Sequence, residues 1–170
     1  RIPNPLALNL YTLGYDANKN LTNLNQATKT NLSTYLEQYR MLTDAINIKN
    51  AFIINFSLDF EITAFKTFNN NEVILSCISE LIDHFNIDKW QVNQPIIRSE
   101  IENLIAGVTG VQTVEKVELT NENGEISGYS KYKYDFTGAT KKGVIYPSLD
   151  PSIFELKYPN SDIKGRVTTY

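Results

Sequence analysis

The alternation of side chains over residues 51–65 constrains the fold more than any other part of the sequence. One set of alternate positions is apolar: Ile54, Phe56, Leu58, Phe60, Ile62 and Ala64. The positions between them are polar: Asn55, Ser57, Asp59, Glu61 and Thr63. A period of two predicts a β-strand with one buried side and one solvent-facing side. Such a strand is typical of an antiparallel or mixed sheet, and other parts of the chain must cover its apolar side.

Three helices are expected around this strand, because apolar residues recur three and four positions apart in each of them. In the first, over residues 25–39, they are Leu32, Tyr35, Leu36 and Tyr39. In the second, over residues 72–85, they are Ile74, Cys77, Ile78, Leu81, Ile82 and Phe85. In the third, which ends near residue 108, they are Ile101, Leu104, Ile105 and Val108.

The third helix has a clear predicted beginning and end. Ser99 and Glu102 fit a capping box, in which each side chain binds a free backbone N–H at the start of the helix. Gly107 and Gly110 suit its end, where glycine tolerates the conformation that closes a helix.

Further strands are predicted after this helix. Residues 111–119 favour a strand, Asn123-Gly124 is a strong hairpin-turn signal, and residues 129–136 favour the returning strand. Short strands are expected at residues 143–146 and 153–158.

Together these elements predict an α+β fold with a small mixed or antiparallel sheet and two to three helices packed on one face. Residues 1–50 are expected to form an extended N-terminal arm and a helix, residues 51–140 the α+β core domain, and residues 141–170 an extended C-terminal tail. Pro3 and Pro5 exclude the arm from a central strand. The tail has few core-forming positions, so we expect it to lie along a partner.

Composition excludes several classes of function. The chain has 170 residues, 42% of them hydrophobic, which is enough for a packed core. Its net charge of -3 argues against nucleic-acid binding, which needs a basic face. No apolar run approaches the roughly 20 residues that span a bilayer. The single cysteine, Cys77, excludes an internal disulfide and fits a reducing compartment. Because the sequence begins with Arg1 rather than Met, we expect a fragment or a processed product.

The titratable residues do not form a recognisable catalytic pattern. His84 is the only histidine, and no nucleophile stands at a suitable spacing from it, so a helix-surface role is favoured over that of a general base. Cys77 lies on an apolar helix stripe, which favours a core residue over a reactive thiol. Asp59 and Glu61 share one face of a strand; a solvated face is favoured over a carboxylate pair for acid–base chemistry. We therefore expect no catalytic, cofactor-binding or metal-binding residues.

Two aromatic features leave alternatives open. Residues 129–134 interleave tyrosine with lysine, a pattern that can stack the bases of single-stranded nucleic acid. In an acidic chain, a cross-strand aromatic face with solvated lysines is favoured. Trp90 is either a core residue or an interface anchor, and the sequence does not separate these.

Four segments, in this order along nearly the whole chain, carry a resemblance to a known family. They are residues 10–16 (LYTLGYD), 35–48 (YLEQYRMLTDAINI), 86–96 (NIDKWQVNQPI) and 143–155 (GVIYPSLDPSIFE). The chain resembles the C-terminal part of the baseplate wedge subunits of T-even-type contractile-tail phages, in the baseplate J-like family.

The resemblance implies a structural protein of the virion tail baseplate, assembled in the host cytoplasm, without catalytic residues or cofactors. Such wedge subunits form homodimers that link neighbouring wedges into a ring, and they bind other baseplate wedge proteins. Family members are longer than this chain, so the resemblance also implies a missing N-terminal part. Two other functions stay open: a receptor- or carbohydrate-binding module, suggested by the many tyrosines and asparagines, and a glycan hydrolase using Asp59 and Glu61.

Overall fold

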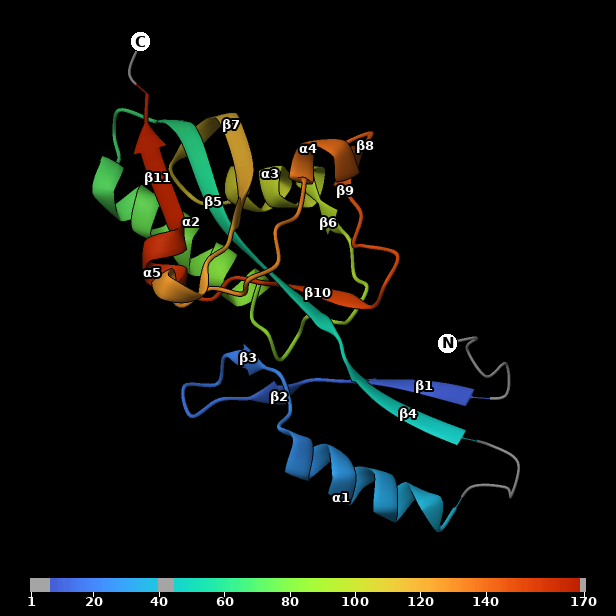
Figure 1. Cartoon of the computed structure of the whole chain (residues 1–170). Coiled ribbons are helices and arrows are strands. Elements are labelled where there is room, and N and C mark those ends of the chain that lie inside the picture. Colours follow the sequence, from blue (N-terminus) through green and yellow to red (C-terminus); the bar gives the residue numbers. More distant parts are fainter. Residues whose placement is uncertain (1–6, 40–44, 169–170) are drawn as a thin grey trace. The chain divides into compact units, whose positions relative to one another are not determined.

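The computed structural model describes residues 7–39 and 45–168 and divides the chain into two units (Figure 1). Unit 1 comprises residues 1–52 and unit 2 residues 53–170. Both units combine helices with small sheets, which confirms the predicted α+β class. Pro3 and Pro5 lie outside the described residues, as do Thr43 and Asp44, whose residue types favour a turn after the first helix.

Unit 1 is built on a pair of parallel strands. The strand β1 (Ala7–Thr12) lies beside β4 (Ala45–Asn50), with Leu8 opposite Ile46 and Leu10 opposite Ile48. The strand expected in the N-terminal arm is therefore present. Since parallel strands cannot be joined by a tight turn, the residues between β1 and β4 must cross back along the pair.

A hairpin and one helix make that connection. The strands β2 (Gly14–Tyr15) and β3 (Leu21–Thr22) are antiparallel, and Asp16 closes their turn by accepting hydrogen bonds from two backbone N–H groups. The helix α1 (Gln26–Glu37) then begins after Asn25, whose side chain accepts from the N–H of Thr28 at 2.8 Å. The helix predicted over residues 25–39 is confirmed.

The sheet of unit 2 is centred on one long strand. The strand β5 (Phe52–Ala64) pairs antiparallel with β7 (Val111–Glu122) and parallel with β11 (Ile163–Val167). It also pairs with β10 (Ser152–Glu155). The strand predicted over residues 51–65 is confirmed, and every other strand of this sheet depends on it.

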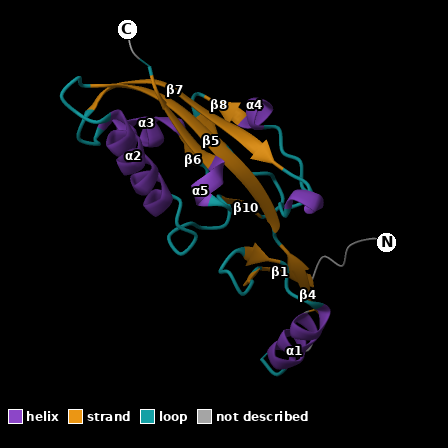
Figure 2. Ribbon diagram, turned by 90° about the vertical axis from the view of Figure 1, so that its left-hand side faces the viewer, coloured by secondary structure: helices purple, strands orange, loops and turns teal. Residues whose placement is uncertain are grey.

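Two helices cover one face of this sheet. The helix α2 (Asn70–His84) packs on β11, and α3 (Arg98–Ala106) packs on β7 and on α2. Figure 2 shows both on the same side of the strands. The core between them is apolar, and its largest fully buried side chains are Phe56, Phe60, Phe154, Leu58, Ile62, Leu81, Ile96, Ile101 and Ile105. The predicted helix pair on one face is confirmed.

Shorter elements complete unit 2. The strands β6 (Ile96–Ile97), β8 (Thr140–Lys141) and β9 (Val144–Ile145) form a small antiparallel sheet. Two single-turn helices, α4 (Phe136–Ala139) and α5 (Pro159–Asp162), precede β8 and β11.

The solvent-facing side predicted for β5 is wrong for its first half. Asn55 and Ser57 are buried, whereas Asp59, Glu61 and Thr63 are half-buried. Asn55 is covered because the N–H of Ser130 donates to its Oδ1 at 2.7 Å, so a segment far along the chain crosses this end of the strand.

The predicted capping box of the third helix is also wrong. The helix begins at Arg98, two or three residues earlier than its pattern indicated, and the residue before it, Ile97, supplies no side-chain cap. The backbone N–H of Arg98 donates instead to the carbonyl of Gly143 at 2.9 Å. A neighbouring hairpin turn thus satisfies the first backbone N–H of the helix.

The returning strand predicted over residues 129–136 does not form. Residues Glu125–Ser127 make a 3-10 turn, and the chain then runs without strand pairing to α4. Side chains hold this segment in place of a partner strand: the N–H of Tyr134 donates to Asn121 Oδ1 at 2.8 Å, and Ser130 is bound by Asn55.

Residues 141–170 are not the extended tail that the sequence indicated. β10 and β11 belong to the main sheet, and Ile153 and Phe154 are only 4% and 2% exposed. Pro151 lies just before β10, and Pro159 opens α5, so neither removes a hydrogen bond that the fold needs. Both prolines stand where an element of this segment begins.

Replacing Phe60 tests the centre of this core. Phe60 is 1% exposed and lies opposite Val117 and Gly165 on the two neighbouring strands. We expect Phe60→Ala to lower the free energy of unfolding by about 3–5 kcal/mol, measured by urea denaturation. Phe65→Ala is the control, because Phe65 is 47% exposed, and should cost less than about 1 kcal/mol. A small loss in Phe60→Ala would contradict this packing.

Candidate functional site

The strand pair of unit 1 has an apolar side that its own unit covers poorly. Among the described residues of this unit only Leu21 and Ala51 are buried, and α1 contributes no buried residue. Leu8, on the same side as Leu10 and Ile46, is 62% exposed. A two-stranded sheet is marginal in water, and parallel pairs are normally buried on both sides. This surface therefore needs a cover.

The edges of this pair also lack the usual protection. Within the part of the chain that the structure describes, neither β1 nor β4 has a second strand partner. β1 carries no charge, and β4 carries only Lys49, whose ammonium lies 5.9 Å from the centre of the Tyr11 ring. Natural edge strands are commonly blocked by charged side chains. β11 in unit 2 follows that rule with Lys164 and Arg166, whereas β1 and β4 remain open to pairing.

The helix of unit 1 presents aromatic side chains to solvent. Tyr35 and Tyr39 are 56% and 71% exposed, and their ring centres lie 5.2 Å apart. Tyrosine is enriched in protein interfaces because it combines apolar area with a polar end. The exposed leucine, the uncharged edges and the tyrosine pair together form the assembly surface: β1, β4 and α1.

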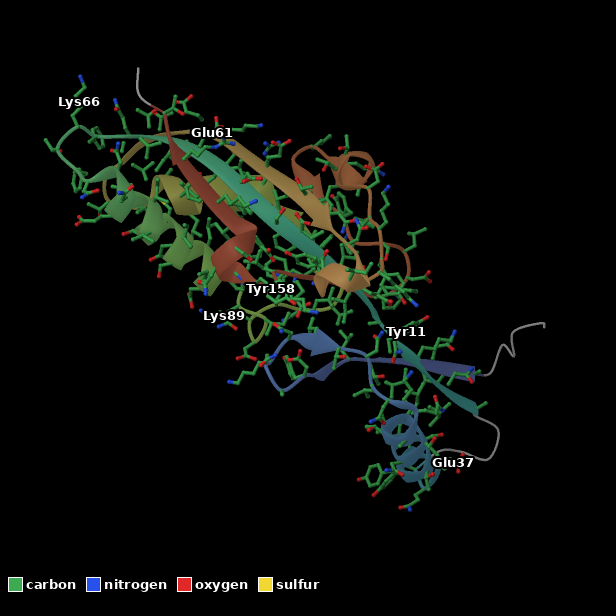
Figure 3. All side chains as sticks on the ribbon, turned by 60° about the vertical axis from the view of Figure 1, so that its left-hand side comes forward. Tyr11, Glu37, Glu61, Lys66, Lys89 and Tyr158 are labelled. Carbon is green, nitrogen blue, oxygen red and sulfur yellow. The ribbon has the colours of Figure 1, made fainter. Side chains whose placement is uncertain are left out.

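Glu61, one of the two carboxylates predicted to share a face of β5, takes part in an ion pair of the sheet surface. Glu61 lies 3.4 Å from Arg166 on β11 (Figure 3), and Lys116 lies 2.6 Å from Glu118 on β7. The neighbouring Glu118 raises the pKa of Lys116, and Lys116 lowers the pKa of Glu118. Asp59 lies opposite Glu118 in the strand register. No cluster of three potential metal ligands occurs among residues 7–39 and 45–168.

His84 and Trp90 lie together at the end of α2. The ring of His84 contacts those of Phe85 and Trp90, with centres 4.9 and 6.0 Å apart, so it is half-buried in an aromatic cluster rather than standing free on the surface. Trp90 is 8% exposed, which makes it a core residue of unit 2. The structure therefore brings these two residues together but aligns no nucleophile with the imidazole among the contacts it describes.

Two buried carboxylates were not anticipated from the sequence. Glu155 accepts from Asn55 Nδ2 at 2.8 Å, and Asp162 accepts from the hydroxyl of Tyr129 at 2.6 Å and the N–H of Tyr158 at 2.9 Å. No local pattern reveals them, because their main partners lie 33 to 100 residues away. Glu155 links β10 to β5, and Asp162 binds the segment after β7 through Tyr129, so both have a structural role.

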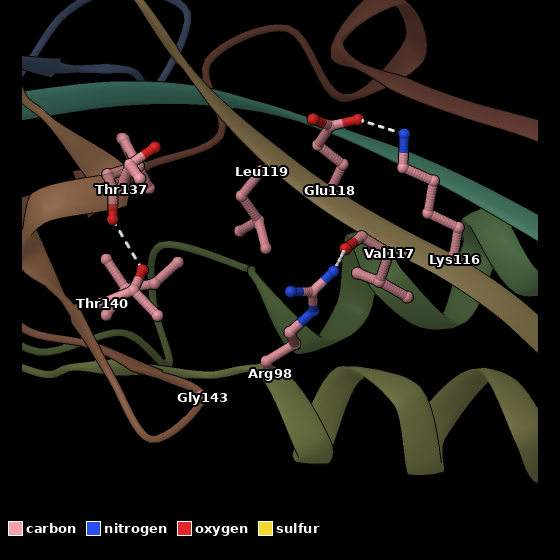
Figure 4. A pocket seen from close by; sticks show the side chains of 10 residues that line it. Arg98, Lys116, Val117, Glu118, Leu119, Thr137, Thr140 and Gly143 are labelled. Atoms are coloured by element: carbon pink, nitrogen blue, oxygen red, sulfur yellow. Dashed lines mark hydrogen bonds and ion pairs between the residues drawn. The ribbon is translucent and has the colours of Figure 1, made fainter.

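A hollow of about 360 Å³ lies between α3, β7 and the β8–β9 hairpin (Figure 4). The guanidinium of Arg98 reaches across it and donates to the carbonyl of Val117, and it also lies 3.3 Å from Glu102. The ammonium group of Lys116 is likewise paired with the carboxylate of Glu118. The guanidinium of Arg98 thereby connects α3 to β7. Because both cationic groups that line this hollow are already paired with protein atoms, neither is free to bind a charged ligand.

No protein-family model matches the sequence. No curated protein matches it either. No helix among the described residues is long and apolar enough to cross a membrane. The baseplate resemblance therefore stays a prediction.

The reactivity of Cys77 tests its role as a core residue. Its side chain is fully buried in α2, and burial raises the pKa of the thiol to about 11. Since only the thiolate reacts, we expect labelling by a disulfide reagent at pH 8 to be at least about 100-fold slower in native than in urea-unfolded protein. Equal rates in both states would show that the thiol is accessible.

Replacing Tyr129 tests the buried contact with Asp162. Burial, and then the hydrogen bond to Asp162, raise the pKa of Tyr129 above its ordinary value. A raised folded-state pKa adds stability that is complete below pH 10, where unfolded tyrosine titrates, and is lost as the pH rises further. We expect Tyr129→Phe to cost about 1.5–3 kcal/mol at pH 7. We also expect a smaller loss of stability above pH 10 than in the parent protein.

The matched control for this variant is Tyr146→Phe, because the Tyr146 side chain is 49% exposed. Urea denaturation at pH 7 and at pH 10.5 provides both measurements. An unchanged alkaline loss in Tyr129→Phe would contradict the contact with Asp162.

Proposed function

We propose that this chain is a structural component of a phage tail baseplate wedge, which forms a homodimer and binds other baseplate wedge proteins in the virion. The observation that carries the proposal is the assembly surface of unit 1. A parallel strand pair with uncharged edges, an exposed leucine and uncovered tyrosines is poorly suited to stand alone in water. It is well suited to a permanent position inside a larger assembly.

A second copy of this chain is the partner we assign to that surface. The same strand from two copies pairs antiparallel about a two-fold axis, so each residue and its counterpart exchange identical contacts. This arrangement requires no second sequence and places no like charges opposite one another, since β1 is uncharged. It converts two strands into a four-stranded sheet and doubles the apolar area around Leu8 and Leu10. A stable interface of this kind buries at least about 1,000 Å² in total.

The remaining features agree with a structural role rather than an enzymatic one. Glu61 on β5 lies in a surface ion pair, the buried Glu155 and Asp162 accept hydrogen bonds from protein groups, and His84 packs against aromatic rings. The proposal places the protein in the tail baseplate, with assembly in the host cytoplasm and without catalysis or a cofactor.

Sedimentation of the full chain at micromolar concentration tests the dimer. The monomer mass is 19.3 kDa, so the parent protein should sediment as a species of about twice that mass. Leu8→Lys adds a charge beside the uncharged edge and should produce the monomer, with an unchanged circular dichroism spectrum. Leu75→Lys is the matched control: Leu75 is 65% exposed on α2 in unit 2, and this variant should remain dimeric.

Two results would overturn the assignment. A parent protein that stays monomeric at tens of micromolar would show that these residues do not carry the contact. A Leu8→Lys variant that still dimerises would exclude the β1 edge. The genes beside the one for this chain give an independent check, since a baseplate protein is expected among tail genes.

A further inference from the structure

One end of the sheet in unit 2 holds a hollow with a volume of about 820 Å³. Its walls come from the ends of β5 and β11, the starts of α2 and β7, and the turn that contains Lys66 (Figure 3). Sites for small ligands commonly have volumes of about 300–1,000 Å³. Because all these walls belong to unit 2, the hollow does not depend on the assembly surface.

Amide and hydroxyl groups dominate this lining. Asn69, Asn70 and Asn71 follow one another at the start of α2, and Gln112 and Thr113 face them from β7. Asn69 Oδ1 accepts from the N–H of Asn71 at 3.0 Å and so caps the helix. Within the described contacts, the side chains of Asn70, Asn71 and Gln112 make no hydrogen bond and are free to bind a ligand.

The charges of this hollow are few and balanced. Lys66 is its only cation and Glu115 its only anion among the described residues that line it. The carboxylate of Glu115 accepts from the hydroxyl of Thr63 at 3.1 Å. A site with one charge of each sign favours neither anions nor cations. A neutral ligand rich in hydrogen-bonding groups fits it better.

An aromatic ring stands at the rim of the hollow. Phe68 is 44% exposed, and its N–H donates to the carbonyl of Phe65 at 3.0 Å, which fixes the turn. Gly110, with φ of +102°, allows this arrangement: a Cβ there would lie 3.1 Å from Phe68 Cγ and 2.6 Å from Val73 Cγ2. The ring is thus held by its backbone while a large part of its surface stays open to a ligand.

We propose that this hollow binds a neutral oligosaccharide. A sugar hydroxyl both donates and accepts, as do the side-chain amides of Asn71 and Gln112. The C–H face of a pyranose ring is apolar and packs on an exposed aromatic ring such as that of Phe68. Glycan binding goes beyond the assembly role and rests on different residues. A test of one proposal therefore does not decide the other.

A glycan array followed by calorimetric titration of the strongest neutral oligosaccharide tests the inference. The double variant Asn71→Ala with Gln112→Ala should weaken binding at least about tenfold, since two hydrogen-bonding groups are lost. Phe68→Ala should weaken it by a similar factor. Asn103→Ala, an exposed amide on α3 outside the hollow, is the matched control and should bind like the parent protein.

Leu8→Lys should also bind like the parent, which separates glycan binding from dimerisation. Three results would overturn the inference: no neutral glycan bound at millimolar concentration, binding restricted to sialylated or sulfated glycans, or a neutral glycan whose affinity is unchanged in both hollow variants.

Discussion

The pairing of β5 with three other strands is the constraint on which the rest of unit 2 depends. β5 contacts a strand of the middle of the chain, β7, and two strands of its C-terminal part, β10 and β11. Its side chains Phe56, Leu58, Phe60 and Ile62 are at most 1% exposed. The helices α2 and α3 pack on the same face, and the buried amide of Asn55 captures the segment after β7. All of these contacts depend on the presence of β5.

The two units differ in the size of their buried cores and in the protection of their strand edges. Unit 2 has an extensive buried apolar core, pairs its buried carboxylates and places Lys164 and Arg166 on its edge strand β11. Unit 1 has two buried residues among those described and two strand edges without a partner. A chain that protects one sheet edge with charge and leaves another uncharged has the asymmetry expected of an assembly component. This contrast supports the proposed function more strongly than any single residue.

Sequence periodicity predicted the elements whose hydrogen bonds are local or whose apolar faces are regular. The strand β5 and the helices α1, α2 and α3 all belong to this group. The errors arose where distant groups satisfy the backbone. The carbonyl of Gly143 accepts from the N–H of Arg98 at the start of α3, and Asn121 and Asn55 hold residues that resembled a hairpin strand. The uncharged β1 edge was visible in the sequence, whereas the hollow at Asn71 and Gln112 was not, because it combines residues from three stretches of the chain, 63–71, 112–115 and 167–168.

The parallel pairing of β5 with β11 has a consequence for how the protein is made. Residues 58–62 find their partners only at residues 163–167, about a hundred positions later in the chain. During synthesis, β5 therefore leaves the ribosome long before the strand that completes its sheet. The apolar side chains of β5 are not fully covered until that strand has been synthesised. Strand pairs between residues so far apart in the sequence also form slowly. Unit 2 is thus expected to complete its main sheet only after residue 167 has left the ribosome.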